Sequence, residues 1–444
     1  MTLLTNNASI EAAMFRVIVQ LVAIIAVARI SGNLFRRMGQ PSVCGEIAAG
    51  LILGPSLFGK FFPGIFQTMF DPGVTPVFNI LSQLGLILVM FLMGLEFDFD
   101  HLPDNRRTAV SVSVAGILLP FSLGFVLGKV MHAQLALTGS WVNFSLFMAT
   151  AMSITAIPVL GRIMIELNIT RTRIGSITIS AAAINDAIGW IILALITAIV
   201  RSTFDPMRLA TMVVAIVVYA LTMAFLVRPL VARWASWTLR QNHGELSLNG
   251  MAVLLVLVLL SSLATNAIGI FSLFGAFMMG AVLYDQARLR EAIHRRLNDF
   301  VTTFFLPIFF TYTGLRTDAG AMAGGKLWLF CGLVLMCAMI GKYGGCTWAA
   351  RWNGVSRREA SIIGVMMNAR GLTELIVINV GYELGILPKT VFFMLVFMAV
   401  ATTYITTPVL RRLFRGSELW ESYRLSAFES SRQPEVRARS AGIV

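Results

Sequence analysis

Long apolar stretches separated by short polar ones repeat along the whole chain. Thirteen of them approach the roughly 17–25 residues that an α-helix needs to cross a bilayer. They lie near residues 14–34, 43–58, 77–97, 108–130, 141–165, 174–200, 208–227, 247–266, 268–285, 299–315, 327–350, 359–382 and 390–413. The pattern predicts an all-α polytopic membrane protein with about 13 transmembrane helices.

Composition agrees with this class and constrains the orientation. The chain is 57% hydrophobic and 13% charged, against roughly 25% charged residues in soluble domains. The net charge of +13 comes from basic residues spread over many loops and a tail, which argues against a nucleic-acid surface. These residues favour one set of alternate loops, which predicts an outside N-terminus and a cytoplasmic C-terminus. Without targeting features, we expect a bacterial inner (plasma) membrane.

Three pairs of motifs recur at a nearly constant offset of about 213–230 residues. "GEIAAGLILG" matches "FGAFMMGAVL", "FLMGLEFD" matches "TYTGLRTD", and "SITAIPVLGR" matches "MNARGLTELI". Helices 1–6 then correspond to helices 8–13, and the odd shift of seven inverts the second half in the membrane. Inverted repeats of this kind are typical of secondary transporters, with the binding site at the midplane beside broken helices.

Proline and glycine predict where two of the helices break. Pro158 in helix 5 lacks a backbone donor and clashes with the preceding turn, and Gly371 weakens helix 12. The backbone groups released there must face protein or water rather than lipid. We therefore expect helices 5 and 12 to be the broken crossing helices, with freed carbonyl groups around Pro158.

A carboxylate lies near the middle of the apolar segment 174–200, in the stretch "AAAINDAIGW". An ionised Asp186 at that depth costs at least roughly 2.5–3.5 kcal/mol. It lies about 18 Å along its helix from the predicted inner end, and Lys342 lies about 12 Å from the inner end of segment 327–350. The two side chains could therefore pair inside the membrane, either as a packing salt bridge or as part of a binding site.

Neighbouring oxygens favour the second interpretation. Asn185, Ser153 and Thr155, with the carbonyls near Pro158, could complete a cation shell around the carboxylate. Burial also favours the neutral form of a carboxylic acid, so protons and cations would compete for Asp186.

A second pair of charges lies in helix 12. Arg370 and Glu374 stand four residues apart, on one face of a helix. We expect them to form a structural ion pair that braces the break.

Several of these segments together are similar to the monovalent cation:proton antiporter-2 family. They are "SITAIPVLGRIMIEL", "SAAAINDAIGWIILAL", "GLRTD", "GKYGG" and "MNARGLTELIVINVGYELGIL" with "FFMLVFMAVATTYITTPVL". The resemblance is nearest to plant-type cation/H+ exchangers and Kef-type antiporters and covers most of residues 15–413. It implies the Na+/H+-antiporter fold, a homodimer, and a six-helix core that moves against a dimerisation domain.

The resemblance also implies roles for single residues. It makes Asp186 the carboxylate that carries cation and proton, with Asn185 beside it. Ser153 and Thr155 then belong to the unwound part of helix 5. Lys342 matches a basic residue that neutralises a helix end or pairs with the aspartate.

Two departures limit what the resemblance implies. The Asn185-Asp186 pair is commoner in electroneutral exchangers, whereas electroneutral relatives tend to differ at the position of Lys342. The stoichiometry therefore stays open. The tail contains no GxGxxG motif, so we expect no Kef-type nucleotide-binding domain.

Domain limits follow from the same resemblance. We expect residues 1–103 and 245–325 to form the dimerisation domain and 104–201 with 326–414 the ion-binding core. Residues 202–244 would be a linker helix, and 415–444 a cytoplasmic tail.

The sequence thus predicts a secondary antiporter that exchanges Na+ or K+ for H+ by alternating access and needs no cofactor. The alternative is a gated cation channel or uniporter on the same scaffold. An intramembrane enzyme is not expected, because one midplane aspartate and no buried histidine provide neither an aspartyl dyad nor a serine–histidine pair.

Overall fold

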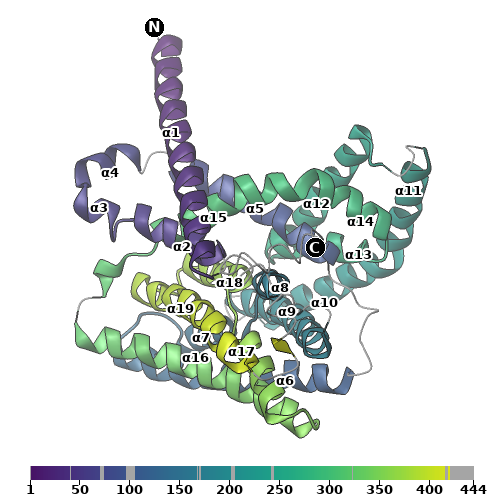
Figure 1. Cartoon of the computed structure of the whole chain (residues 1–444). Helices are drawn as coiled ribbons and strands as arrows, with labels where there is room; N and C mark the ends of the chain where they lie inside the picture. Colours follow the sequence, from purple (N-terminus) through teal and green to yellow (C-terminus); the bar gives the residue numbers. More distant parts are fainter. Residues whose placement is uncertain are drawn as a thin grey trace, which may run out of the picture. The chain divides into compact units, whose positions relative to one another are not determined.

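The computed structural model describes residues 2–40, 42–70, 75–96, 106–167, 169, 172–201, 206–241, 245–322, 324–415, 419 and 420. Within these ranges the regular structure is helical (Figure 1). The chain divides into two compact units. The first comprises Met1–Ile30, Ala48–Asp100 and Leu193–Arg316, and the second Ser31–Ile47, His101–Ile192 and Thr317–Val444. The dimerisation and ion-binding roles expected for parts of the chain stay predictions.

The first unit contains the N-terminal helices and the middle of the chain. Its elements are α1 (Thr2–Arg37, up to residue 30), the end of α2 (Ser42–Leu53), α3 (Phe58–Phe61), α4 (Pro63–Met69), α5 (Thr75–Glu96), α10 (Pro206–Thr222), η2 (Met223–Val227), α11 (Arg228–Gln241), α12 (Leu248–Ile268), α13 (Ser272–Val282), α14 (Ala287–Ile293), η3 (His294–Asn298), η4 (Val301–Phe305) and α15 (Leu306–Leu315).

The second unit carries most of the charged residues that the sequence singles out. Its elements are α6 (Arg106–Gln134), α7 (Trp141–Ser153), α8 (Ile157–Glu166), most of α9 (Arg173–Arg201), η5 (Ala319–Ala321), α16 (Gly325–Trp352), α17 (Arg357–Met367), α18 (Leu372–Glu383) and α19 (Lys389–Phe414). It also includes the end of α1 and the start of α2.

Each predicted apolar segment falls on a helix or a run of helices. Among the described residues, eight helices are long and apolar enough to span a membrane, or nine with the bent pair α17–α18. The remaining segments correspond to the short helices α2, α13 and α15 and to the interrupted pair α7–α8. The all-α membrane architecture is confirmed, and the number of about 13 spans stays a prediction.

Glycines let helices of the two halves approach closely at two equivalent places. A Cβ added at Gly94 of α5 would lie 3.0 Å from the Cα of Gly280 on α13. One added at Gly314 of α15 would lie 2.4 Å from the Cα of Gly50 on α2. The motif "FLMGLEFD" of the first half thus contacts "FGAFMMGAVL" of the second, and "TYTGLRTD" of the second half contacts "GEIAAGLILG" of the first. The two contacts are equivalent under the predicted repeat.

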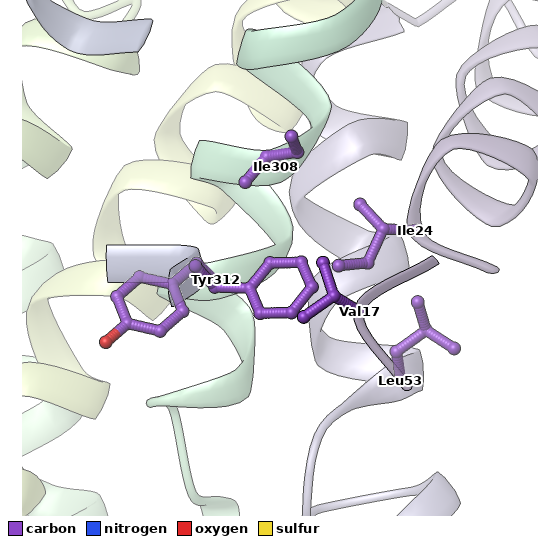
Figure 2. Packing of buried hydrophobic residues seen from close by; sticks show 6 residues of the cluster. Val17, Ile24, Leu53, Ile308 and Tyr312 are labelled. Atoms are coloured by element: carbon purple, nitrogen blue, oxygen red, sulfur yellow. The ribbon is translucent and has the colours of Figure 1, made fainter. Parts of the chain in front are cut away.

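Apolar packing dominates around α1 in the first unit. Figure 2 shows Val17 and Ile24 of α1 near Leu53 of α2 and near Ile308 and Tyr312 of α15. Val17 and Ile24 are seven residues apart, and Ile308 and Tyr312 four, so each pair shares one helix face. Between membrane helices such contacts contribute through van der Waals packing rather than through removal of apolar surface from water.

In the second unit, α6 packs against α7 and α16, and α16 packs against α17 and α19 (Figure 1). Small residues bring α6 and α16 together. A Cβ at Gly345 would lie 2.6 Å from the carbonyl oxygen of Ala115, and one at Gly341 2.8 Å from the Cα of Pro120. This close approach places Lys342 directly against the backbone of α6.

Candidate functional site

The first helix interruption separates α7 from α8. Helix α7 ends at Ser153, residues 154–156 are not helical, and α8 begins at Ile157. Pro158 is therefore the second residue of α8, where its missing N–H is not needed by the helix. The break lies before Pro158 rather than around it, so the carbonyl groups that it releases belong to the end of α7.

The second interruption separates α17 from α18 and bends their axes by 43°. It spans residues 368–371 and includes Gly371, as predicted. The structure gives a steric reason for this glycine. A Cβ at Gly371 would lie 2.4 Å from Cγ2 of Val159 in α8, so the two interruptions pack against each other at this point.

The C-terminal end of α7 is held by the guanidinium group of Arg370. Its Nη1 donates to the carbonyl oxygen of Ala151 at 3.0 Å, and its Nη2 donates to that of Met152 at 2.7 Å. The last carbonyl groups of a helix lack partners within the helix and carry its negative partial charge. A buried cation at this end therefore supplies both the missing donors and the complementary charge.

Lys342 completes this arrangement from α16. Its side chain is fully buried, and its Nζ donates to the carbonyl oxygens of Ser153 and of Gly116, the latter at 2.9 Å. These hydrogen bonds place the ammonium group at the end of α7, the helix-end role that the resemblance allows for Lys342. The expected pairing of Lys342 with Asp186 stays a prediction.

Asp186 and Asn185 lie on α9 and are 1% and 0% exposed. The Oδ1 atom of Asn185 accepts a hydrogen bond from the backbone N–H of Thr155 at 3.1 Å. This bond ties the middle of α9 to the interruption between α7 and α8. The Nδ2 atom of Asn185 is buried without a hydrogen-bond partner among the described residues.

The two hydroxyl groups predicted for the site are already engaged as donors. Thr155 Oγ1 donates to the carbonyl oxygen of Met367, the last residue of α17, at 3.4 Å. Ser153 Oγ donates to the carbonyl oxygen of Thr150 within its own helix at 3.0 Å. A donating hydroxyl still has lone pairs, so each oxygen can accept from or coordinate a further group.

Arg370 and Glu374 form the predicted ion pair, with Nη1 3.0 Å from Oε1 and both side chains fully buried. Arg370 lies in the break and Glu374 in the first turn of α18, so the pair does not share one continuous helix. Glu374 also lies where a helix favours negative charge.

Thr403 of α19 is a site residue that the sequence did not reveal. It accepts from the backbone N–H of Arg370 at 2.9 Å and donates to its carbonyl oxygen at 2.6 Å. Its signal was a row of threonines in an apolar helix, "ATTYITTP", all of which are buried.

Among the described residues, four buried acidic and basic side chains thus lie near the two interruptions: Asp186, Lys342, Arg370 and Glu374. Two are acidic and two basic, so their charges balance when all are ionised. Within the described ranges, no three His, Cys, Asp or Glu side chains gather as a metal site would require. A cation held here would rely on a single carboxylate and neutral oxygens.

Comparison with known proteins shows the family of the chain. The family described as "Sodium/hydrogen exchanger, transmembrane" matches residues 22–416. The Na(+)/H(+) antiporter NhaS4 of Synechocystis sp. is 38% identical over 90% of this chain and 97% of its own. Cation/H(+) antiporter 18 of Arabidopsis thaliana is 35% identical over 90% of this chain and 49% of its own length.

A solved structure shows the same fold. The sodium proton antiporter MjNhaP1 of Methanocaldococcus jannaschii aligns over 93% of this chain and 99% of its own, with a TM-score of 0.59 and 15% sequence identity. The predicted family resemblance and antiporter fold are confirmed.

Proposed function

The chain belongs to the sodium/hydrogen exchanger family, and we propose that it exchanges a monovalent cation, Na+ or K+, for protons across the membrane. The names of its relatives support antiport, and they include both sodium and potassium among the cations. The observation that carries the proposal is the buried Asp186 next to two interrupted, mutually packed helices.

Asp186 is the proposed carrier of both ions. Support comes from its neighbour on α9, because Asn185 accepts from the backbone N–H of Thr155 in the α7–α8 interruption. A cation would coordinate the carboxylate with neighbouring amide, hydroxyl and carbonyl oxygens, whereas a proton would bind the carboxylate alone. Because one carboxylate cannot hold both at once, inward and outward fluxes are coupled.

Burial enforces this coupling. An empty, ionised carboxylate at midplane depth costs at least roughly 2.5–3.5 kcal/mol, so the site changes sides only when a proton or a cation neutralises it. Alternating access follows if the second unit presents Asp186 first to one side of the membrane and then to the other.

The balanced charges lead to an expectation about stoichiometry. A monovalent cation and a proton add the same single charge to Asp186. Lys342 is engaged with two carbonyl oxygens at a helix end, and these contacts are stronger for the charged ammonium form than for the neutral amine. We therefore expect one cation to exchange for one proton without net charge movement.

The test uses proteoliposomes with an imposed pH gradient and a trapped pH-sensitive dye. Adding Na+ or K+ should collapse the gradient with wild type and not with Asp186→Asn. Asp318→Asn is the matched control, because Asp318 lies at the start of η5, where its carboxylate accepts from the N–H of Gly320. Full exchange by Asp186→Asn would refute the role of Asp186.

The same vesicles separate the remaining alternatives. Exchange that is independent of a clamped membrane potential supports one-for-one coupling, since each net charge would change the driving force by about 2.3 kcal/mol per 100 mV. A rate that follows the potential would mean that unequal charges are exchanged and would refute one-for-one coupling. Rapid cation flux that ignores the pH gradient would instead indicate a channel.

A further inference from the structure

A groove of about 700 Å³ runs along the second unit between α6 and α16. Gly344, Gly345 and Ala349 of α16 face Ala115 of α6, and these small residues form its base. Larger apolar side chains rise on both sides: Val114, Leu118, Leu119, Trp348 and Trp352. Its volume lies in the range of roughly 300–1,000 Å³ that is typical of ligand pockets.

The groove has the length of one bilayer leaflet. Its polar limits on α6 are Ser111 and Ser122, which are separated by about 16 Å at about 1.5 Å per residue. Half of a hydrocarbon core about 30 Å thick is about 15 Å. Both walls are helices long and apolar enough to span a membrane, so the opening faces lipid rather than water.

One end of the groove carries the marks of a membrane interface. Trp348 and Trp352 are 63% and 78% exposed, and their ring centroids lie 5.4 Å apart. Tryptophan is enriched at the level of the lipid headgroups. Ser111 and Asn353 also line this end, so polar groups meet the apolar channel there.

A positively charged side chain lies beyond this end of the groove. Arg107 is exposed and lies four residues before Ser111 on α6. It therefore extends the stripe formed by Ser111, Val114 and Leu118, because residues three and four apart share a helix face. Guanidinium groups bind phosphate through two parallel hydrogen bonds. The predicted orientation puts this end on the cytoplasmic side, where the surface of a membrane is negatively charged.

We infer that this groove binds one acyl chain of an anionic phospholipid, with the phosphate at Arg107 and Ser111 and the chain along Gly344 and Gly345. The small residues provide the space, the tryptophans mark the depth of the headgroup, and the arginine selects the negative charge. None of the residues that line the groove is Asp186, Asn185 or Lys342, so the site is distinct from the proposed cation site.

The groove also lies next to the residues that hold Lys342 in place. Lys342 precedes Gly344 by two residues on α16, and its acceptor Gly116 follows Ala115 on α6. A bound chain would fill the outer side of the contact that holds Lys342 in place. Lipid bound here stabilises the α6–α16 pair in its observed packing.

Tryptophan fluorescence can test the site in proteoliposomes of the full chain. Phosphatidylcholine vesicles would contain equal fractions of either brominated phosphatidylglycerol or brominated phosphatidylcholine, since bromine quenches tryptophan on contact. The chain has eight tryptophans, so the signal of Trp348 and Trp352 is the difference from the variant with both changed to Phe. One arginine near a charged surface predicts about fivefold enrichment of the anionic lipid beside this pair.

Two variants with matched controls test the geometry. Gly344→Leu should abolish the preference for the anionic lipid by filling the groove, because its added Cβ would lie 4.0 Å from the nearest atom. Gly332→Leu places the same side chain on α16 where nothing lies within 4 Å, and should keep the preference. Arg107→Gln should remove the preference, whereas Arg106→Gln should largely retain it.

Three results would overturn the inference. They are equal quenching by the two lipids in wild type, a preference that survives both Gly344→Leu and Arg107→Gln, and a tryptophan pair shielded from both lipids. The last result would mean that another copy of the chain covers the groove.

Discussion

The two helix interruptions occupy corresponding places in the two halves of the chain, yet they are stabilised differently. At residues 154–156, buried cations from Lys342 and Arg370 hold the end of α7. At residues 368–371, the carbonyl groups at the end of α17 accept from the next backbone amides and from the hydroxyl of Thr155. By the groups that hold the preceding helix end, the first interruption is charged and the second is neutral, although Arg370 itself lies in the second and binds the first.

The difference shows that a helix interruption can be stabilised either by charged side chains or by neutral hydrogen bonds. Asp186 lies beside the charged interruption, where two cations balance it and Glu374. The two interruptions also stabilise each other, because Arg370 of the second binds the first and Thr155 of the first binds the second. Changes at the charged interruption should therefore cost more stability than changes at the neutral one.

Arg370→Leu should have the largest effect. It leaves Glu374 as a buried charge without its partner and removes the donors to two carbonyl groups, and breaking a buried pair in this way costs about 3–5 kcal/mol. We expect loss of most folded protein from the membrane, measured by fluorescence-detected size exclusion after heating. The control is Arg358→Leu, an exposed arginine that also donates to two carbonyl groups at a helix end and should cost within about 0.5 kcal/mol.

The double variant Arg370→Leu with Glu374→Leu sharpens this result. It removes both charges, so the stability should partly return, since apolar replacements of a complete buried pair are often tolerated. A double variant as unstable as the single one would show that the bonds to α7, rather than the ion pair, account for the cost.

Lys342→Met should rank second, at about 1.5–3 kcal/mol for lost charged hydrogen bonds. The exchange rate should fall further than the loss of folded protein explains, because Asp186 also loses a compensating charge. Lys326→Met is the matched control on the same helix, where an exposed Nζ donates to the carbonyl oxygen of Gln134 at 2.7 Å. Comparable thermal shifts for the two lysines would contradict the special position of Lys342.

Gly371→Ala tests the contact between the two interruptions. The added methyl would overlap with Val159, and overpacking of this kind costs about 1–3 kcal/mol. Adding Val159→Ala should restore part of the thermal stability in a double-variant cycle. Gly332→Ala, in open space on α16, should be neutral or slightly stabilising.

Much of this architecture follows from the sequence because spans and breaks have local causes. Apolar length predicts the helices, and Pro158 and Gly371 indicate the two interrupted ones. The interruption nevertheless begins before Pro158, since proline is well accommodated in the first turn of the new helix. The spacing of Arg370 and Glu374 predicts their ion pair, although only Glu374 lies in a helix.

The partners of the charges were harder to predict. Depth along two helices suggested that Asp186 and Lys342 could meet, but depth does not determine the direction in which each side chain points. The hydrogen bonds of Lys342 go to backbone carbonyl groups, which every residue has and no motif encodes. Thr403 escaped notice for the same reason, because its partner is the backbone of Arg370.

Thr155→Val should have the smallest effect and tests the neutral interruption. It removes the hydrogen bond from Oγ1 to Met367 while keeping the shape, so we expect a loss of about 0.5–1.5 kcal/mol. Thr155→Ser keeps the hydroxyl and should behave like wild type. Thr178→Val is the control, because that buried hydroxyl donates within its own helix. If Thr155→Val instead raises the apparent KM for the cation with little thermal shift, this oxygen binds the transported ion, and the neutral interruption contributes to binding as well as to packing.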